Sequence, residues 1–130
     1  MRSRILFISG RTNDARRLSR MLQDLPVELD HADSLQQARS KLQQEDYSVV
    51  LTEAALPDGH WLEILNLASD IPHGPQVIVT DSQADARFWA EALNLGAYDL
   101  LPQPYYEPEV RRILYNACSR PTGMVRTAAG

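Results

Sequence analysis

The 130-residue sequence contains very little cysteine and lysine. Cys118 is the only cysteine, so no disulfide can form within the chain, and no Cys/His spacing typical of a zinc site is present. We therefore expect a reducing, cytoplasmic setting. Lys41 is the only lysine, which leaves one candidate for any chemistry that requires an amine.

Long apolar runs are also missing. No stretch approaches the length of a membrane-spanning helix, and the apolar run near Met1 is too short for a secretory signal. We therefore expect neither membrane insertion nor export. The three histidines are scattered, and no Ser/His/Asp constellation can be assembled. The sequence therefore predicts no metal site, no cofactor and no enzyme activity.

An excess of positive charge is absent as well. The formal net charge is -4 and the isoelectric point is near 5.3, which argues against direct binding to nucleic acid. Hydrophobic residues make up 44% and charged residues 23% of the chain, as in ordinary globular proteins. The length fits one domain, which we place at residues 1–120, followed by a small, polar and flexible tail at 121–130.

Five short apolar segments alternate with amphipathic segments. The apolar segments predict buried strands at residues 5–8, 27–32, 47–52, 76–81 and 97–101. The intervening segments repeat apolar residues at helical spacing, which includes Phe88 and Leu93 among the expected core residues. Caps are expected at Thr12 or Asn13, at Ser34 and at Ser82, and Gly96 is expected to end the fourth helix.

This alternation predicts a single α/β domain with a doubly wound, flavodoxin-like fold. Five helices should cover both faces of a five-stranded parallel sheet, because its strands are apolar on both sides. Right-handed crossovers favour the strand order 2-1-3-4-5. That order gathers the carboxyl ends of the first, third and fourth strands, so Ser9, Gly10, Glu53 and Asp81 should meet.

Several motifs in this order resemble the response-regulator receiver domain of two-component (phosphorelay) signalling, in particular its chemotaxis receivers, over residues 4 to about 118. They are the strand at 47–52, Leu56-Pro57-Asp58-Gly59, Leu95-Gly96-Ala97 followed by Pro102-Gln103-Pro104, and Glu107-Pro108-Glu109. The resemblance implies an aspartate at the end of strand three that accepts a phosphoryl group. It also implies a magnesium ion held by that aspartate and an acidic pair, with a Ser or Thr and a Lys that contact the phosphate.

The residues at these positions depart from the family pattern. Ser9 and Gly10 replace the acidic pair, Glu53 replaces the acceptor, and Gln103 replaces the lysine. The hydroxyl position is Asp81 without a gap, or Thr80 after a one-residue slip. Magnesium binding is therefore expected to be weak or absent. We hypothesise that Arg11 pairs with Glu53 in place of the metal, the alternative being a solvated Arg11.

The resemblance then implies a degenerate pseudo-receiver that acts through protein–protein interaction without phosphorylation. Its partner would be a sensor kinase or a downstream signalling protein, with a homodimer also possible through the face of helix four, strand five and helix five. The aromatic residues expected on that face are Trp89, Tyr98, Tyr105, Tyr106 and Tyr115.

Three alternatives remain open at this point. The site could have drifted and lost all function. It could accept phosphate on an atypical residue, either Glu53 or Asp81. The turn at residues 9–13 could instead bind an anion or a nucleotide, as the phosphate loop of a flavodoxin does.

Overall fold

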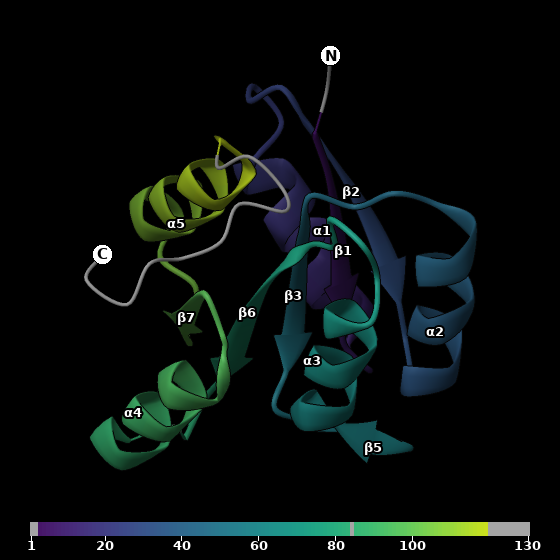
Figure 1. Cartoon of the computed structure of the whole chain (residues 1–130). Helices are drawn as coiled ribbons and strands as arrows, with labels where there is room; N and C mark the ends of the chain where they lie inside the picture. The colour runs from purple at the N-terminus through teal and green to yellow at the C-terminus, as the bar shows by residue number, and fades with distance from the viewer. Residues whose placement is uncertain (1–2, 84, 120–130) are drawn as a thin grey trace.

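Five parallel strands form the centre of the molecule (Figure 1). The computed structural model describes residues 3–83 and 85–119, so the tail predicted at 121–130 lies outside the described residues. The sheet has the order β2-β1-β3-β6-β7, which is the predicted order 2-1-3-4-5. Its strands are β1 (Ser3–Ile8), β2 (Val27–Ala32), β3 (Val49–Glu53), β6 (Gln76–Asp81) and β7 (Asp99–Pro102).

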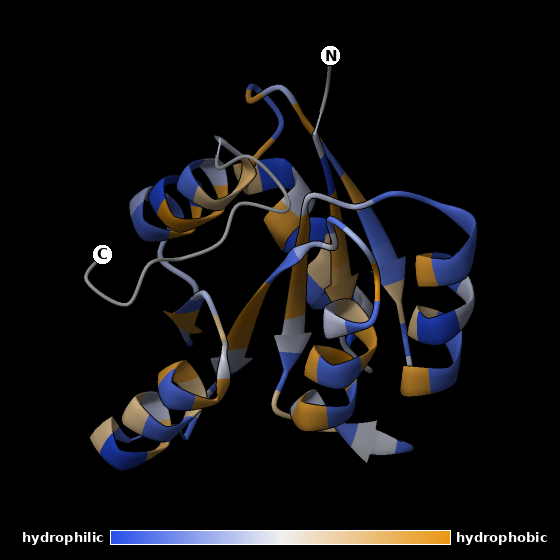
Figure 2. Cartoon of the chain, in the orientation of Figure 1, coloured by the Kyte–Doolittle hydropathy of each residue, from blue (hydrophilic) through white to orange (hydrophobic). Residues whose placement is uncertain are grey.

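Two apolar layers enclose the sheet, one on each face. The helices are α1 (Thr12–Met21), α2 (Leu35–Gln44), α3 (Trp61–Ser69), α4 (Ala86–Leu95) and α5 (Glu107–Ser119). Buried residues of α2, α3 and α4 form one core cluster with the sheet, and those of α1 and α5 form the other. In Figure 2 the apolar colouring accordingly follows the strands and part of each helix. The doubly wound prediction is confirmed.

The helix ends agree with the sequence only in part. The Ser34 hydroxyl accepts a hydrogen bond from the Gln37 N–H at 3.2 Å, as expected of a cap. Gly96 ends α4 with a φ of 120°, which favours glycine. The cap expected at Ser82 is wrong, because α4 begins three residues later and Asp85 caps it.

The start of α1 also differs from the prediction. The expected caps were Thr12 or Asn13, but the helix includes both residues and its N-cap is Arg11. No side chain caps this end. The chain therefore places a cation at the positive end of the helix dipole, where an anion or a small polar residue is favoured.

The Leu-Pro-Asp-Gly motif forms a small hairpin that the sequence did not predict as strands. Strands β4 (Ala55–Leu56) and β5 (Gly59–His60) pair around it. The Asp58 carboxylate accepts hydrogen bonds from the backbone N–H groups of Leu35, at 2.7 Å, and Gln36, at 3.0 Å. These bonds lower the pKa of Asp58, the Leu35 bond most strongly. Asp58 therefore fastens the hairpin to the N-terminus of α2.

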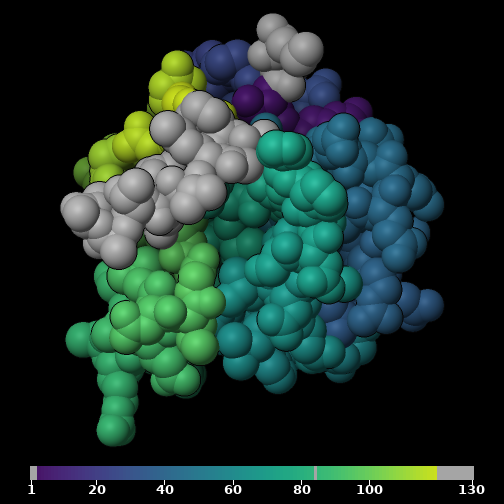
Figure 3. Space-filling model, viewed as in Figure 1, coloured from purple at the N-terminus to yellow at the C-terminus, as the bar shows by residue number. Residues whose placement is uncertain are grey.

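Two expectations about burial are wrong. Leu93 was expected in the core, but its exposed fraction is 46%, because Ala92 is the α4 residue that faces the sheet. Tyr105 was expected on an exposed face, but only 8% of it is accessible, because it packs in the core cluster under α1 and α5. Helix α4 protrudes from the body of the molecule at the lower left of Figure 3.

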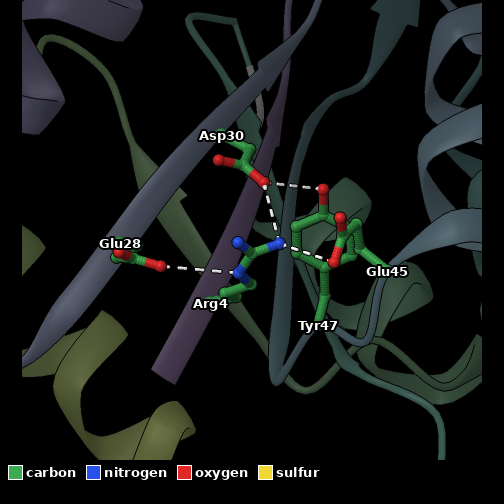
Figure 4. Close-up of polar contacts among 5 residues, drawn as sticks. All are labelled: Arg4, Glu28, Asp30, Glu45 and Tyr47. Carbon is green, nitrogen blue, oxygen red and sulfur yellow. Dashed lines mark hydrogen bonds and ion pairs between the residues drawn. The ribbon is translucent and has the colours of Figure 1, made fainter. Parts of the chain in front are cut away.

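An ion-pair network ties the edge strand to the amino end of the sheet (Figure 4). The Arg4 guanidinium lies 2.8 Å from the Glu45 carboxylate, 3.4 Å from Glu28 and 3.8 Å from Asp30. The Tyr47 hydroxyl donates to Asp30 at 2.8 Å, and burial raises the pKa of Tyr47. The network joins β1, β2 and the connection between α2 and β3. No helix in the described part of the chain is long and apolar enough to cross a membrane.

Candidate functional site

A row of polar residues crosses the carboxyl edge of the sheet. Two positions before each of these polar residues stands an apolar residue that packs on the α1 and α5 side of the sheet. Because side chains alternate along a strand, the polar residues face the same side. The row contains His31, Ser9, Glu53, Thr80 and Gln103. It thus draws on all five strands of the sheet.

Ser9 and Glu53 form the centre of this row. Ser9 is completely buried, and its hydroxyl donates a hydrogen bond to Oε2 of Glu53. The backbone N–H of Arg11 in turn donates to the Ser9 hydroxyl at 3.0 Å. A residue that stands where the family has a metal-binding carboxylate therefore acts as a hydrogen-bond donor to Glu53.

The surroundings of Glu53 disfavour its ionised form. Burial raises the pKa of Glu53 above its ordinary value, and the carboxylates of Asp14 and Asp81 raise it further. The positive charge of Arg11 has the opposite effect and is the second-largest influence. Asp14 comes from the first turn of α1, and only 14% of its side chain is exposed.

The ion pair hypothesised between Arg11 and Glu53 does not form. The Arg11 side chain is exposed, and it makes no ion pair within 4.0 Å with any carboxylate of the described residues. Its charge acts on Glu53 only through space. Ser9 supplies the direct contact instead, since its short side chain lies next to β3 while Arg11 begins the exposed end of α1.

Thr80, and not Asp81, faces the row. Thr80 lies directly opposite Glu53 in the β3–β6 register. The Thr80 hydroxyl donates to the carbonyl oxygen of Leu101 at 2.7 Å and accepts from Nε2 of Gln103 at 3.0 Å. The carboxylate of Asp81 accepts instead from the backbone N–H of Gln83 at 3.3 Å. The one-residue slip is therefore the better alignment of this strand.

Sequence reasoning missed the part that His31 and Asp14 play. His31 was interpreted as an ordinary surface or core histidine, but its Nε2 donates to the carbonyl oxygen of Ser9 at 2.7 Å. Its ring also stacks on Phe7, with the ring centroids 5.9 Å apart. The sequence feature that could have revealed the role of His31 was its place near the carboxyl end of the predicted edge strand. Asp14 gave no such signal, because its orientation depends on where α1 begins.

The residues present do not fit the magnesium ion that the receiver pattern implies. One oxygen of Glu53 accepts the Ser9 proton, and Gly10 has no side chain. Among residues 3–83 and 85–119, no three His, Cys, Asp or Glu side chains are grouped so as to hold a metal. Magnesium requires near-octahedral oxygen ligands, which this arrangement does not supply.

Comparisons with known proteins identify the family. The family model of the response regulator receiver domain matches residues 5–115. The chain belongs to this family. The match covers the sheet except for the first two residues of β1, and all but the end of α5.

Solved receiver structures share the fold at low sequence identity. The signal receiver domain of an HD domain-containing protein from Pseudomonas fluorescens Pf-5 is 25% identical, with a TM-score of 0.78 over 90% of this chain and 87% of that one. The chemotaxis response regulator CheY4 of Vibrio cholerae is 16% identical, with a TM-score of 0.80 over 90% and 99%. A receiver domain from Clostridium thermocellum is 21% identical, with a TM-score of 0.79 over 91% and 95%. No curated protein sequence matches the chain.

Proposed function

We propose that this receiver domain signals without being phosphorylated, as a cytoplasmic protein-interaction module. The observation that carries the proposal is the hydrogen bond from the buried Ser9 hydroxyl to Glu53. In a working receiver this position supplies a metal-binding carboxylate, and here it supplies a proton donor to the acceptor position. Phosphoryl transfer needs cations to neutralise the transferring group. The site instead combines Glu53 with two further carboxylates and a neutral Gln103.

The same contacts favour one fixed state of the domain. In the receiver pattern a hydroxyl and a lysine respond to the phosphate. Here Thr80 is bonded to Leu101 and to Gln103, and Glu53 is bonded to Ser9. These bonds join the end of β1 to β3, and β6 to β7 and the residue after it, without a ligand. The domain then offers a constant surface to its partner.

The surface proposed for that partner flanks the edge strand β7. The large apolar side chains that are strongly exposed among the described residues all lie in α4, in α5 or directly before α5: Leu93, Leu95, Tyr106 and Tyr115. Trp89 and Tyr98 are half-buried there. Aromatic residues with part of their surface exposed are favoured anchors of protein interfaces. We propose this surface, without Tyr105, for a signalling partner or for a second copy of the chain.

Incubation with acetyl phosphate and Mg²⁺, followed by intact-mass measurement, tests the proposal. A conventional receiver treated in parallel should gain the mass of a phosphoryl group, and this chain should not. A gain that disappears in Glu53→Gln or in Asp81→Asn would instead establish an atypical acceptor and overturn the proposal.

A further inference from the structure

Helix α1 carries a concentration of positive charge on an otherwise acidic domain. Residues 11–20 contain four arginines and one aspartate, whereas the whole chain has a net charge of -4. Arg11, Arg16, Arg17 and Arg20 are all exposed. The buried stripe of the helix is formed by Leu18, with Leu22 just after the helix end. The arginines therefore cover the outer side of α1.

Two other arginines are neutralised where they lie, whereas Arg39, Arg87 and Arg112 are exposed without an ion pair among the described residues but lie on three different helices. Arg4 contacts three carboxylates, and Arg111 forms a two-point contact with Asp24 while it also donates to the carbonyl oxygen of Met21. On α1 only Arg17 has such a partner, Asp14 at 3.7 Å. Arg16 and Arg20 make no ion pair with a carboxylate of the described residues. The positive charge on α1 is thus largely uncompensated.

Two features of this arrangement oppose the helix that carries it, although Asp14 in its first turn and Arg20 in its last turn suit the helix dipole. Arg16 and Arg20 are four residues apart, where like charges repel, and Arg11 stands at the N-cap, where the helix dipole disfavours a cation. Thr12 and Asn13, either of which would make a better cap, are the next two residues. Residues that oppose local stability without a structural gain commonly serve binding.

The arginine face borders a hollow beside the site. This hollow has a volume of about 280 Å³, and Arg11, Asp14 and Arg17 line its α1 side. Ser82, Gln103 and Tyr105 line the other side. The Tyr105 hydroxyl is buried without a hydrogen-bond partner among the described residues, and burial raises the pKa of Tyr105 while the nearby Thr80 hydroxyl lowers it. The hollow thus offers the unpaired guanidinium of Arg11, the guanidinium of Arg17, which also pairs with the Asp14 carboxylate in the lining, and neutral donors to one acidic side chain.

We propose that α1 binds an acidic segment of a partner protein. Glutamates or aspartates of that segment contact Arg16 and Arg20, and one further carboxylate enters the hollow toward Arg11 and Arg17. The negative charge of the rest of the domain confines an acidic partner to this helix and so sets its orientation. The net charge of -4 disfavours a nucleic acid as the partner of these arginines. The inference rests on the proposed function, in which the domain acts by binding proteins.

Fluorescence anisotropy with a labelled peptide, in which glutamate alternates with glycine and serine, tests the inference. The peptide should bind at low salt and weaken as salt rises. Arg16→Gln together with Arg20→Gln should weaken binding roughly tenfold. The matched control is Arg39→Gln together with Arg87→Gln, which removes the same charge from exposed positions on α2 and α4. This control should change the affinity for the peptide by no more than roughly twofold.

Three results would overturn the inference. They are no peptide binding at low salt, equal weakening in both double variants, and tighter binding of a single-stranded oligonucleotide of matched charge through the same arginines. None of them bears on the proposed function, which the mass measurement decides separately. Circular dichroism of both double variants checks that neither loses helix content.

Discussion

Glu53 keeps a carboxylate at the family's acceptor position, but the acidic pair and the lysine that accompany the acceptor in the family pattern are replaced in this chain. Burial and two nearby carboxylates oppose its charge, and the only direct compensation is the Ser9 hydroxyl. An amide would serve nearly as well as a hydrogen-bond acceptor, and it would carry no charge to desolvate. The carboxylate therefore makes a pH-dependent contribution to folding.

Replacing Glu53 by Gln should make stability less dependent on pH. Because the folded pKa of Glu53 is raised, its favourable contribution is complete below the unfolded pKa of about 4.3 and is lost as the pH rises through the folded value. Wild type should therefore lose stability relative to Glu53→Gln from mildly acid to neutral pH. Urea unfolding across that range measures this, with Glu91→Gln, an exposed position on α4, as the control. A relative gain for wild type as the pH rises would contradict the interpretation.

The contribution of Asp58 to stability should depend on pH in the opposite sense to that of Glu53. Its pKa is lowered by the backbone N–H groups of α2, so its contribution is present above the unfolded pKa and is lost as the pH falls through the lower folded value. Asp58→Ala should lower the melting temperature by a few degrees at neutral pH, and the difference should shrink in acid. Asp33→Ala removes a nearby exposed carboxylate as the control. A difference that grows in acid would be inconsistent with the capping role.

Residue-scale prediction from sequence succeeded where strand alternation alone decides orientation. Ser9 and Glu53 were correctly expected to meet at one sheet edge, because a buried strand fixes which side its last residues face. Asp81 was expected to meet them as well but bonds to the Gln83 N–H instead, and Gln103 was assigned to the site only through the family resemblance. Arg11 was mispaired, since a long side chain at a helix start has many rotamers and only the fold selects one. His31 was undervalued because its contact is with a backbone carbonyl, which no sequence motif reveals.

At the scale of elements, strands and their order were predictable, and helix starts were not. Apolar runs and Gly96 mark strands and one helix end unambiguously. Small polar residues near a helix start leave its first turn undecided: Thr12 and Asn13 were expected as caps but lie inside α1, and Ser82 was expected where Asp85, three residues later, is the cap. The short hairpin around Pro57 was missed because each of its strands contains only two residues.

Gly96 gives a direct test at this scale. Its φ of 120° is strained for any other residue, while the nearest atom to an added Cβ is 3.8 Å away, so backbone strain alone should act. Gly96→Ala should cost about 1–3 kcal/mol of unfolding free energy. At Gly10 the added Cβ would lie 3.5 Å from Pro57 in ordinary contact, and Gly10→Ala should change stability by no more than about 0.5 kcal/mol. Equal effects in urea unfolding would refute the strain argument.

At the scale of the whole molecule, the exposed apolar residues around β7 and the arginines of α1 are two separate surfaces. Leu93→Ser together with Leu95→Ser should leave the fold stable, because both side chains are about half exposed. It should also reduce self-association, measured by light scattering over a concentration series, because the variant lowers the apolar area available for burial. Arg16→Gln with Arg20→Gln serves as the control from the other surface. Unchanged association in the leucine variant would remove α4 from the proposed interface.

The most direct test of phosphate-independent signalling compares the natural chain with a restored one. The restored variant carries Ser9→Asp, Gly10→Asp, Glu53→Asp and Gln103→Lys, and position 10 has room for the first side-chain atom of the added aspartate. Both proteins are incubated with acetyl phosphate and Mg²⁺, and their intact masses are measured. We expect one added phosphoryl group on the restored variant and none on the natural chain. A phosphoryl group on the natural chain would show that the domain does not signal independently of phosphate.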